Sequence, residues 1–276
     1  MSVLQPEVET TSLGAWWRQM VTNVALRGQF AATWIARGVG LTKPRAADPA
    51  LLADGVTFVL PGIEAESIFT WGICDGLTMG GIPGGMKIFN WGLPLPGGYL
   101  ANLCWMDRNR RRGGDLSREI VAYQDRFPGR PVHLAAQSGG AGVAVFAAEA
   151  LPAGREIEGL ILLNGALSPG YDLRRALAKC RRGILNSYSH KDSVVLGWGT
   201  RLLGTTDRKF CDACGRVGFK LPAELDEAGR GLYAKLTQVE WCQEHAANCG
   251  HWGGHITSAN EEFLARYIVP WVRGGT

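Results

Sequence analysis

The chain has 276 residues, of which 46% are hydrophobic and 20% charged, and this composition is typical of a soluble globular protein. Its formal net charge of +4 is too small to indicate a nucleic-acid partner. We find no apolar run near the roughly 20 residues of a membrane helix and no secretory signal, so we expect no transmembrane segment. Seven scattered cysteines, an odd number, favour a reducing, cytoplasmic location.

The N-terminal residues differ in pattern from the rest of the chain. Residues 14–39 mix tryptophan, arginine and apolar residues in the manner of a helical segment, and a polar, proline-containing stretch follows at 42–49. We therefore expect an N-terminal helical arm over residues 1–49 and a main domain over residues 50–276. The pair Trp16-Trp17 favours docking of the arm on that domain, with membrane-surface contact or dimerisation as alternatives.

From residue 56 onward, short β-rich runs alternate with helical segments. We predict strands over 56–60, 87–91, 131–136, 160–164, 183–188 and 235–239. Helices are predicted over 64–78, from 115 or 117 to 127, over 139–151 and over 258–272, the last with a capping box of Ser258 and Glu261. This order predicts an α/β fold: a mostly parallel central sheet with helices on both faces and the functional site along its carboxyl edge.

The stretch V-H-L-A-A-Q-S-G-G-A-G, residues 132–142, carries the strongest functional signal. Ser138 stands where a predicted strand ends and a helix begins, and the residues two positions away, Ala136 and Gly140, are both small. A sharp turn can then project the serine from the sheet edge, above the positive end of the helix dipole. The chain here resembles the α/β-hydrolase superfamily over residues 55–275, with Ala136 in place of the first glycine of G-x-S-x-G.

The resemblance implies a Ser-His-Asp triad in the chain order serine, acid, histidine. The acid is expected after a later strand, where Asp192 stands in a loop followed by Val194-Val195. The base is expected before the last helix, where His255 lies in the glycine-rich segment C-G-H-W-G-G-H. We expect Asp192 and His255 in these roles. The competitors are Asp172, read as a helix-start residue, and the other histidines, His251 first among them, then His133, His190 and His245.

An oxyanion hole needs two backbone N–H groups beside the nucleophile. The resemblance implies that Gly139 supplies one and that Ile63 supplies the other, from the loop L-P-G-I-E after the strand at 56–60. Gln137 and His251 are candidate substrate-binding residues, and His251 is alternatively a support for its loop. No metal ligand and no cofactor are expected.

Two other patterns invite a functional reading. Cys211 and Cys214 form C-x-x-C, and with Cys242, His245, Cys249 and His251 downstream a zinc site is conceivable, although the irregular spacing favours free thiols over zinc or a redox pair. The basic run R-N-R-R-R at 108–112 is read as a solvated surface loop, with steering of anionic substrates as the alternative.

These observations together predict a serine hydrolase acting on a small-molecule acyl compound through an acyl-enzyme. A carboxylic ester is the default substrate, and thioesters, lactones and amides share the chemistry. The alternatives are a non-catalytic binding or scaffold protein with the same fold and, less favoured, a metal-dependent enzyme built on the cysteines.

Overall fold

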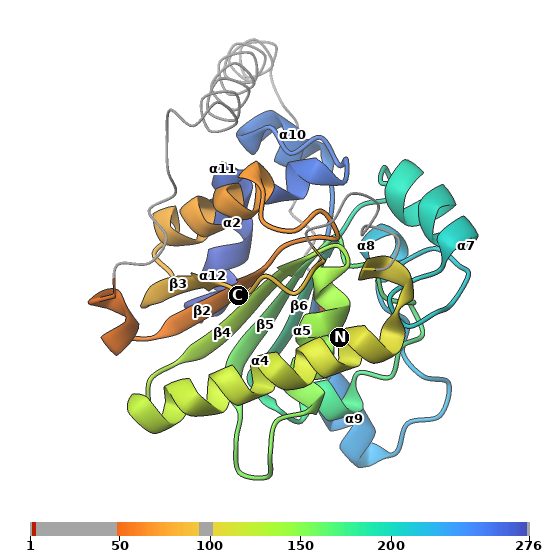
Figure 1. Ribbon diagram of the computed structural model, residues 1–276. Coiled ribbons are helices and arrows are strands. Elements are labelled where there is room, and N and C mark those ends of the chain that lie inside the picture. Colours follow the sequence, from red (N-terminus) through yellow and green to blue (C-terminus); the bar gives the residue numbers. More distant parts are fainter. Residues whose placement is uncertain (1, 4–48, 94–101, 275–276) are drawn as a thin grey trace.

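The computed structural model describes residues 2–3, 49–93 and 102–274 (Figure 1). Its centre is a seven-stranded sheet in the order β1-β7-β6-β5-β4-β2-β3, and every neighbouring pair of strands is parallel. The strands are β1 (Ser2–Val3), β2 (Val56–Leu60), β3 (Gly85–Ile88), β4 (Val132–Gln137), β5 (Ile157–Leu163), β6 (Cys180–Tyr188) and β7 (Leu236–Glu240).

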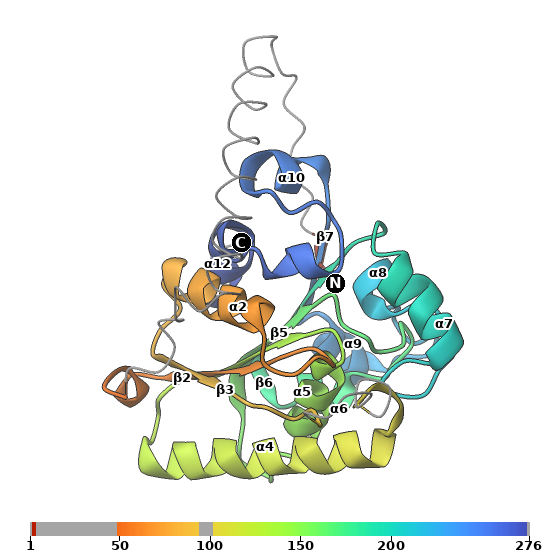
Figure 2. The ribbon, with the colours of Figure 1, turned by 45° about the horizontal axis from the view of Figure 1, so that its top comes forward.

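Helices cover both faces of this sheet (Figures 1 and 2). The α-helices are α2 (Ile68–Met79), α4 (Met106–Arg126), α5 (Gly140–Glu149), α6 (Arg174–Leu177), α7 (Thr200–Leu203), α8 (Cys214–Val217), α9 (Glu227–Tyr233), α10 (Gln243–Cys249), α11 (Glu261–Phe263) and α12 (Val269–Val272). Short 3₁₀ turns form η1 (Leu51–Ala53) and η3 (Ile256–Ala259), and wider π turns form η2 (Val194–Gly199) and η4 (Leu264–Ile268).

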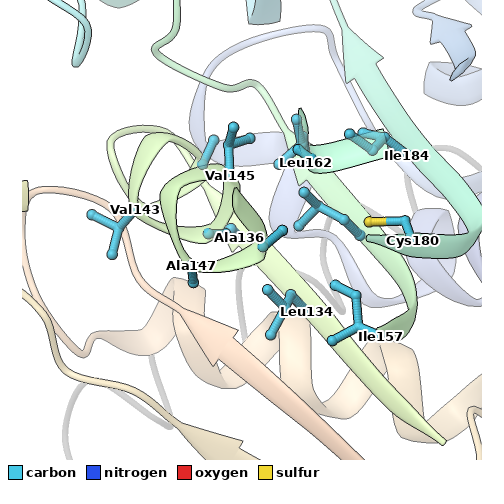
Figure 3. Close-up of a cluster of buried hydrophobic side chains, with 14 of the residues drawn as sticks. Leu134, Ala136, Val143, Val145, Ala147, Ile157, Leu162, Cys180 and Ile184 are labelled. Carbon is cyan, nitrogen blue, oxygen red and sulfur yellow. The ribbon is translucent and has the colours of Figure 1, made fainter. Parts of the chain in front are cut away.

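Alternate residues of each inner strand enter two separate cores. Leu134 and Ala136 of β4 pack with α5 on one face (Figure 3), whereas Ala135 between them packs toward α2 and the C-terminal helices on the other. Strands buried on both faces are continuous apolar runs in the sequence, and this pattern predicts β2 and β5. The predicted α/β fold, with a parallel sheet between helical layers, is confirmed.

Most of the N-terminal arm lies outside the described residues, and so do Trp16 and Trp17. Ser2 and Val3 are described, and they pair with Thr237 and Gln238 of β7. The first residues of the chain therefore extend the sheet of the main domain as an edge strand, which the prediction of a helical arm from residue 1 did not include. None of the described helices combines the length and the apolar character needed to cross a membrane.

Helix α4 corrects the prediction of a loop at residues 108–112. The helix begins at Met106 and includes the whole basic run. Two of the arginines lie over aromatic rings: the guanidinium of Arg110 is 4.6 Å from the ring centre of Phe146, and that of Arg112 is 4.9 Å from the ring centre of Phe89. Long basic side chains can cover apolar surface in this way, so a charged run need not be a loop.

The start of the C-terminal helix also differs from the prediction. The helix begins at Glu261, and the cap is Asn260, whose side chain accepts a hydrogen bond from the N–H of Phe263 (2.9 Å). Ser258 lies one turn earlier and donates instead to the carbonyl of His255 (3.0 Å). The π turn at η4 precedes Pro270, which has no N–H to continue the normal helical ladder.

Candidate active site

Ser138 occupies the turn between β4 and α5 in a strained backbone conformation. Its φ is +53°, a value that residues other than glycine adopt at a cost of about 1–3 kcal/mol. Hydrogen bonds hold it there: its N–H donates to the carbonyl of Leu163 (3.0 Å), and its own carbonyl accepts from Ala141 (3.1 Å) and Ala166 (3.0 Å). The turn is thereby fixed at the carboxyl edge of the sheet.

The small residues around Ser138 are required by close approaches of the backbone. A Cβ on Gly140 would overlap the carbonyl oxygen of Pro61, and one on Gly139 would lie 2.6 Å from Cγ2 of Ile63. Ala136 is paired with Leu60 across β2 and β4 and is fully buried. The loop after β2 therefore packs directly on the serine turn.

Asp192 and His255 meet at the same edge although 63 residues separate them in the sequence. His255 Nδ1 lies 2.6 Å from Asp192 Oδ2, which also accepts a hydrogen bond from Asn164 Nδ2 (2.9 Å). Because an ionised carboxylate only accepts hydrogen bonds, the hydrogen of His255 is held on Nδ1 and the lone pair of Nε2 stays free. Asp192 is 2% exposed, so its carboxylate is shielded from water.

Ser138 lies at the same edge of the sheet as Asp192 and His255. Among the described residues, no hydrogen bond joins Ser138 Oγ to His255. Ser138 directly follows β4, Asp192 lies after β6 and His255 lies after β7. Residues that follow three different strands therefore meet at the carboxyl edge of the sheet. Catalytic hydrogen bonds are often long without substrate and tighten when it binds.

His251 stands apart from this group. It is 0% exposed, its Nδ1 lies 2.9 Å from Thr257 Oγ1, and its ring lies 4.4 Å from that of Phe263. Burial, with a smaller effect from His245, lowers its pKa to about 3, so the imidazole is neutral. A fully buried ring is not open to a substrate in this conformation. These contacts agree with the alternative that His251 supports the loop.

The remaining competitors lie elsewhere. His133 is buried inside β4, His190 is at the surface with Nε2 3.0 Å from Glu240, and His245 packs against Tyr267. Asp172 pairs with Arg174 (2.7 Å), and its hydrogen bonds to that arginine lower the pKa of the carboxyl. None of these residues contacts Asp192 or His255 through a hydrogen bond among the described residues.

The two candidate oxyanion donors are in contact with each other. The Ile63 side chain and the Trp91 ring both border Gly139: Cγ2 of Ile63 lies 2.6 Å, and the ring of Trp91 3.3 Å, from where a Cβ on Gly139 would lie. Within the described part of the chain, neither a carbonyl nor a side chain accepts from the backbone N–H of Ile63 or Gly139. Both N–H groups are therefore without a protein acceptor in the described part of the chain, as an oxyanion donor must be before substrate binds.

No protein-family model matches this sequence, and no curated protein matches it. Three solved structures resemble its arrangement at low identity. A Trichoderma reesei cutinase in complex with a phosphonate inhibitor is 14% identical, with 93% of this chain and 91% of that chain covered and a TM-score of 0.42. TT1662 from Thermus thermophilus is 14% identical (83% and 91% covered, TM-score 0.42), and MenH from S. aureus is 13% identical (84% and 97% covered, TM-score 0.39).

The chain's own geometry identifies its architecture. A parallel sheet lies between helical layers, and a serine at positive φ joins an inner strand to the following helix. The chain has the α/β-hydrolase fold. In this fold the nucleophile turn and the loop carrying the second oxyanion donor follow neighbouring strands, and here β4 and β2 are indeed neighbours.

Two further polar side chains border the site of this α/β-hydrolase fold. Gln137, the candidate substrate-binding residue, lies with Nε2 3.5 Å from the carbonyl of His255, so its side chain faces the loop of the histidine. Glu64 follows Ile63 and is half-buried. Burial raises the pKa of Glu64 above its usual value, and hydrogen bonds from backbone N–H groups offset part of that rise.

The cysteine motif does not gather ligands. Cys214 is fully buried and donates from Sγ to the carbonyl of Gly165 (3.3 Å), and burial raises its pKa far above the usual value. All seven cysteines are free thiols, and the described residues hold no group of three or more His, Cys, Asp or Glu side chains that could bind a metal ion.

Sequence reasoning missed three residues that shape the site. Asn164 directly follows β5, has a φ of +45° and orients Asp192, and a polar residue directly after the apolar run L-I-L-L was a usable signal. Trp91 and Asn102 were not detectable, because their partners, Pro61 and Ile63, are 30 and 39 residues away and no local pattern marks them.

Proposed function

We propose that this chain is a serine hydrolase with Ser138 as nucleophile, His255 as general base and Asp192 as the group that orients the base. The observation that carries the proposal is the 2.6 Å contact between Asp192 and His255 at the sheet edge where Ser138 follows β4. A neutral serine is a weak nucleophile and needs such a base, whose tautomer the carboxylate fixes.

The chemistry follows from these groups. Ser138 Oγ attacks the acyl carbon while its proton moves to Nε2 of His255, and the N–H groups of Gly139 and Ile63 stabilise the oxyanion. The tetrahedral intermediate expels the leaving group, which takes the proton from His255. Water then attacks the acyl-enzyme with His255 again as base, and the carboxylic acid leaves.

The substrate class in this proposal is a small acyl compound. A carboxylic ester is the first choice, since the triad supplies every proton that the expulsion of an alcohol requires. Thioesters, lactones and amides would follow the same steps. No metal ion or organic cofactor takes part in the proposed steps.

A fluorophosphonate that labels activated serines tests the proposal directly. We expect wild-type protein to be labelled and labelling to be lost in both Ser138→Ala and His255→Ala. The matched controls are Ser193→Ala and His190→Ala, which alter the same residue types outside the proposed triad and should label like wild type. Hydrolysis of p-nitrophenyl butyrate should follow the same pattern.

The same experiment separates the alternatives. Well-folded wild-type protein that takes up no label would contradict the proposal and favour a binding or scaffold protein with this fold. Labelling that persists in His255→Ala would remove His255 from the role of base.

A further inference from the structure

The loop after β2, residues 61–66, has each of its first three carbonyl groups held by a donor. The indole Nε1 of Trp91 donates to the carbonyl of Pro61 (2.8 Å), and the N–H of Ala65 donates to that of Gly62 (3.3 Å). The side-chain amide of Asn102 donates to the carbonyl of Ile63 (2.9 Å). A surface loop normally leaves such groups to water, so this loop is unusually well fixed.

These bonds determine where the N–H of Ile63 points. In a planar trans peptide the N–H and the preceding C=O point in opposite directions. The carbonyl of Gly62 is turned into the loop toward Ala65, so the N–H of Ile63 is turned outward. Asn102 fixes the next peptide, and with the peptides on both sides of Ile63 held, its N–H cannot rotate out of this outward orientation.

Asn102 can hold this position because its own orientation is determined. It is 0% exposed, its Oδ1 accepts from the N–H of Leu93 (2.8 Å) and lies 3.3 Å from Nη1 of Arg108. Its backbone carbonyl accepts from Nδ2 of Asn109 (2.7 Å). With donors facing Oδ1, the amide cannot flip, and Nδ2 must face Ile63.

The loop would not keep this shape unaided. Ala65 adopts φ +65°, a conformation that costs an alanine about 1–3 kcal/mol, so the loop stores strain that its external hydrogen bonds must offset. Removing the bond from Asn102 releases the segment that carries both Ile63 and the strained alanine.

We infer that Asn102 is a positioning residue for the oxyanion hole: its amide aligns the N–H of Ile63 for the developing oxyanion without touching substrate itself. This inference rests on the proposed function, since it concerns the donor that the serine reaction would use. It predicts a defect in the chemical step and little change in substrate binding.

The test is Asn102→Asp, assayed with p-nitrophenyl butyrate and with the fluorophosphonate. The substitution keeps the shape and the acceptor for Leu93 and gains Arg108 as a charged partner, so the fold should persist. It removes the N–H donor to Ile63. Loss of a whole oxyanion donor costs about 10²–10³ in kcat, so a misaligned donor should lower kcat and the labelling rate about 10–100-fold, with KM changed less than about threefold.

Asn186→Asp is the control. Asn186 lies on β6, is also 0% exposed, and its amide also donates to a backbone carbonyl, that of Cys214 (3.4 Å), but among the described residues it makes no hydrogen bond with Ile63 or Asn102. We expect Asn186→Asp to keep kcat within about threefold of wild type, although it too removes a buried amide donor.

Each outcome is informative. Wild-type labelling that Asn102→Asp leaves unchanged overturns the inference and leaves the serine-hydrolase proposal standing. Equal kcat losses in Asn102→Asp and Asn186→Asp overturn it as well, because the effect would then be one of general stability. Absence of any Ser138-dependent labelling in wild type overturns the proposed function and the inference with it.

Discussion

His251 and His255 lie four residues apart in one glycine-rich loop, yet their surroundings are opposite. His255 faces a buried carboxylate at 2.6 Å and keeps Nε2 free toward the sheet edge. His251 has a hydroxyl partner on Nδ1, no partner on Nε2 among the described residues, and aromatic rings on its faces. The residue type and the loop are the same, and only the neighbours distinguish an imidazole that can accept a proton from one that is held neutral.

The difference has an energetic cause. Transfer of a charged imidazolium into an apolar site is unfavourable unless a partner charge compensates it. Asp192 offers that compensation to His255, whereas burial among Phe263 and His245 lowers the pKa of His251 to about 3. A base must become charged during the reaction, so only the first environment suits catalysis.

The largest expected effect comes from removing the charge of Asp192. Asp192→Asn keeps the shape but lets the amide donate to Nδ1, which forces the hydrogen of His255 onto Nε2. We expect kcat/KM for p-nitrophenyl butyrate to fall about 10³–10⁴-fold, the size of effect known for the wrong histidine tautomer.

The control for that substitution is Asp226→Asn. Asp226 caps α9 by accepting from the N–H of Gly229 (2.8 Å), and asparagine caps a helix equally well, so activity and stability should both be retained. If Asp192→Asn were as active as Asp226→Asn, the Asp192 carboxylate would not be what distinguishes His255 from His251.

The contrast between the histidines also marks the limit of what the sequence could reveal. The sharp turn at Ser138 could be predicted because its signals are local: a strand, small neighbouring residues and a helix lie within eleven residues. Asp192 and His255 could be proposed from chain order and from their place after strands. Their mutual contact, and the burial of His251, depend on packing between distant segments that no local pattern encodes.

The errors have similar causes. The sequence predicts that α4 begins after the basic run, because charged residues favour solvent. In the structure the run is helical, and two of its arginines lie over the rings of Phe146 and Phe89. Ser258 and Glu261 fit a capping box, but Asn260 is an equally good cap two residues closer to the helix. Local rules allowed both, and tertiary packing selected one.

A smaller effect is expected in the stability of the protein at acid pH, because His133 and His245 are buried as His251 is. Burial lowers the pKa of His133 and of His245 to about 4. The unfolded chain binds protons on these residues near pH 6.5 and the folded chain does not, so the free energy of unfolding falls as pH decreases from about 6.5 to about 4. Carboxyls with raised pKa, such as Glu64 and Glu149, act in the opposite direction.

His133→Leu isolates one of these contributions. Neither ring nitrogen of His133 has a hydrogen-bond partner among the described residues, so leucine should lose no bond. The slope of unfolding free energy against pH should decrease by up to about 1.4 kcal/mol per pH unit within that window, measured by urea titration. Thr57→Val, in register with His133 on β2, is the non-titrating control and should keep the wild-type slope.

The smallest expected effect is that of replacing His251. His251→Leu removes the bond to Thr257 and a ring nitrogen without a partner, while leucine still fills the space against Phe263. We expect a loss of about 1 kcal/mol in unfolding free energy and fluorophosphonate labelling within tenfold of wild type. His255→Leu should instead lose labelling while remaining folded, although it removes the partner of the buried Asp192 carboxylate. If His251→Leu also abolished labelling while remaining folded, the buried ring would have to open during the reaction, and the assignment of the base would pass to His251.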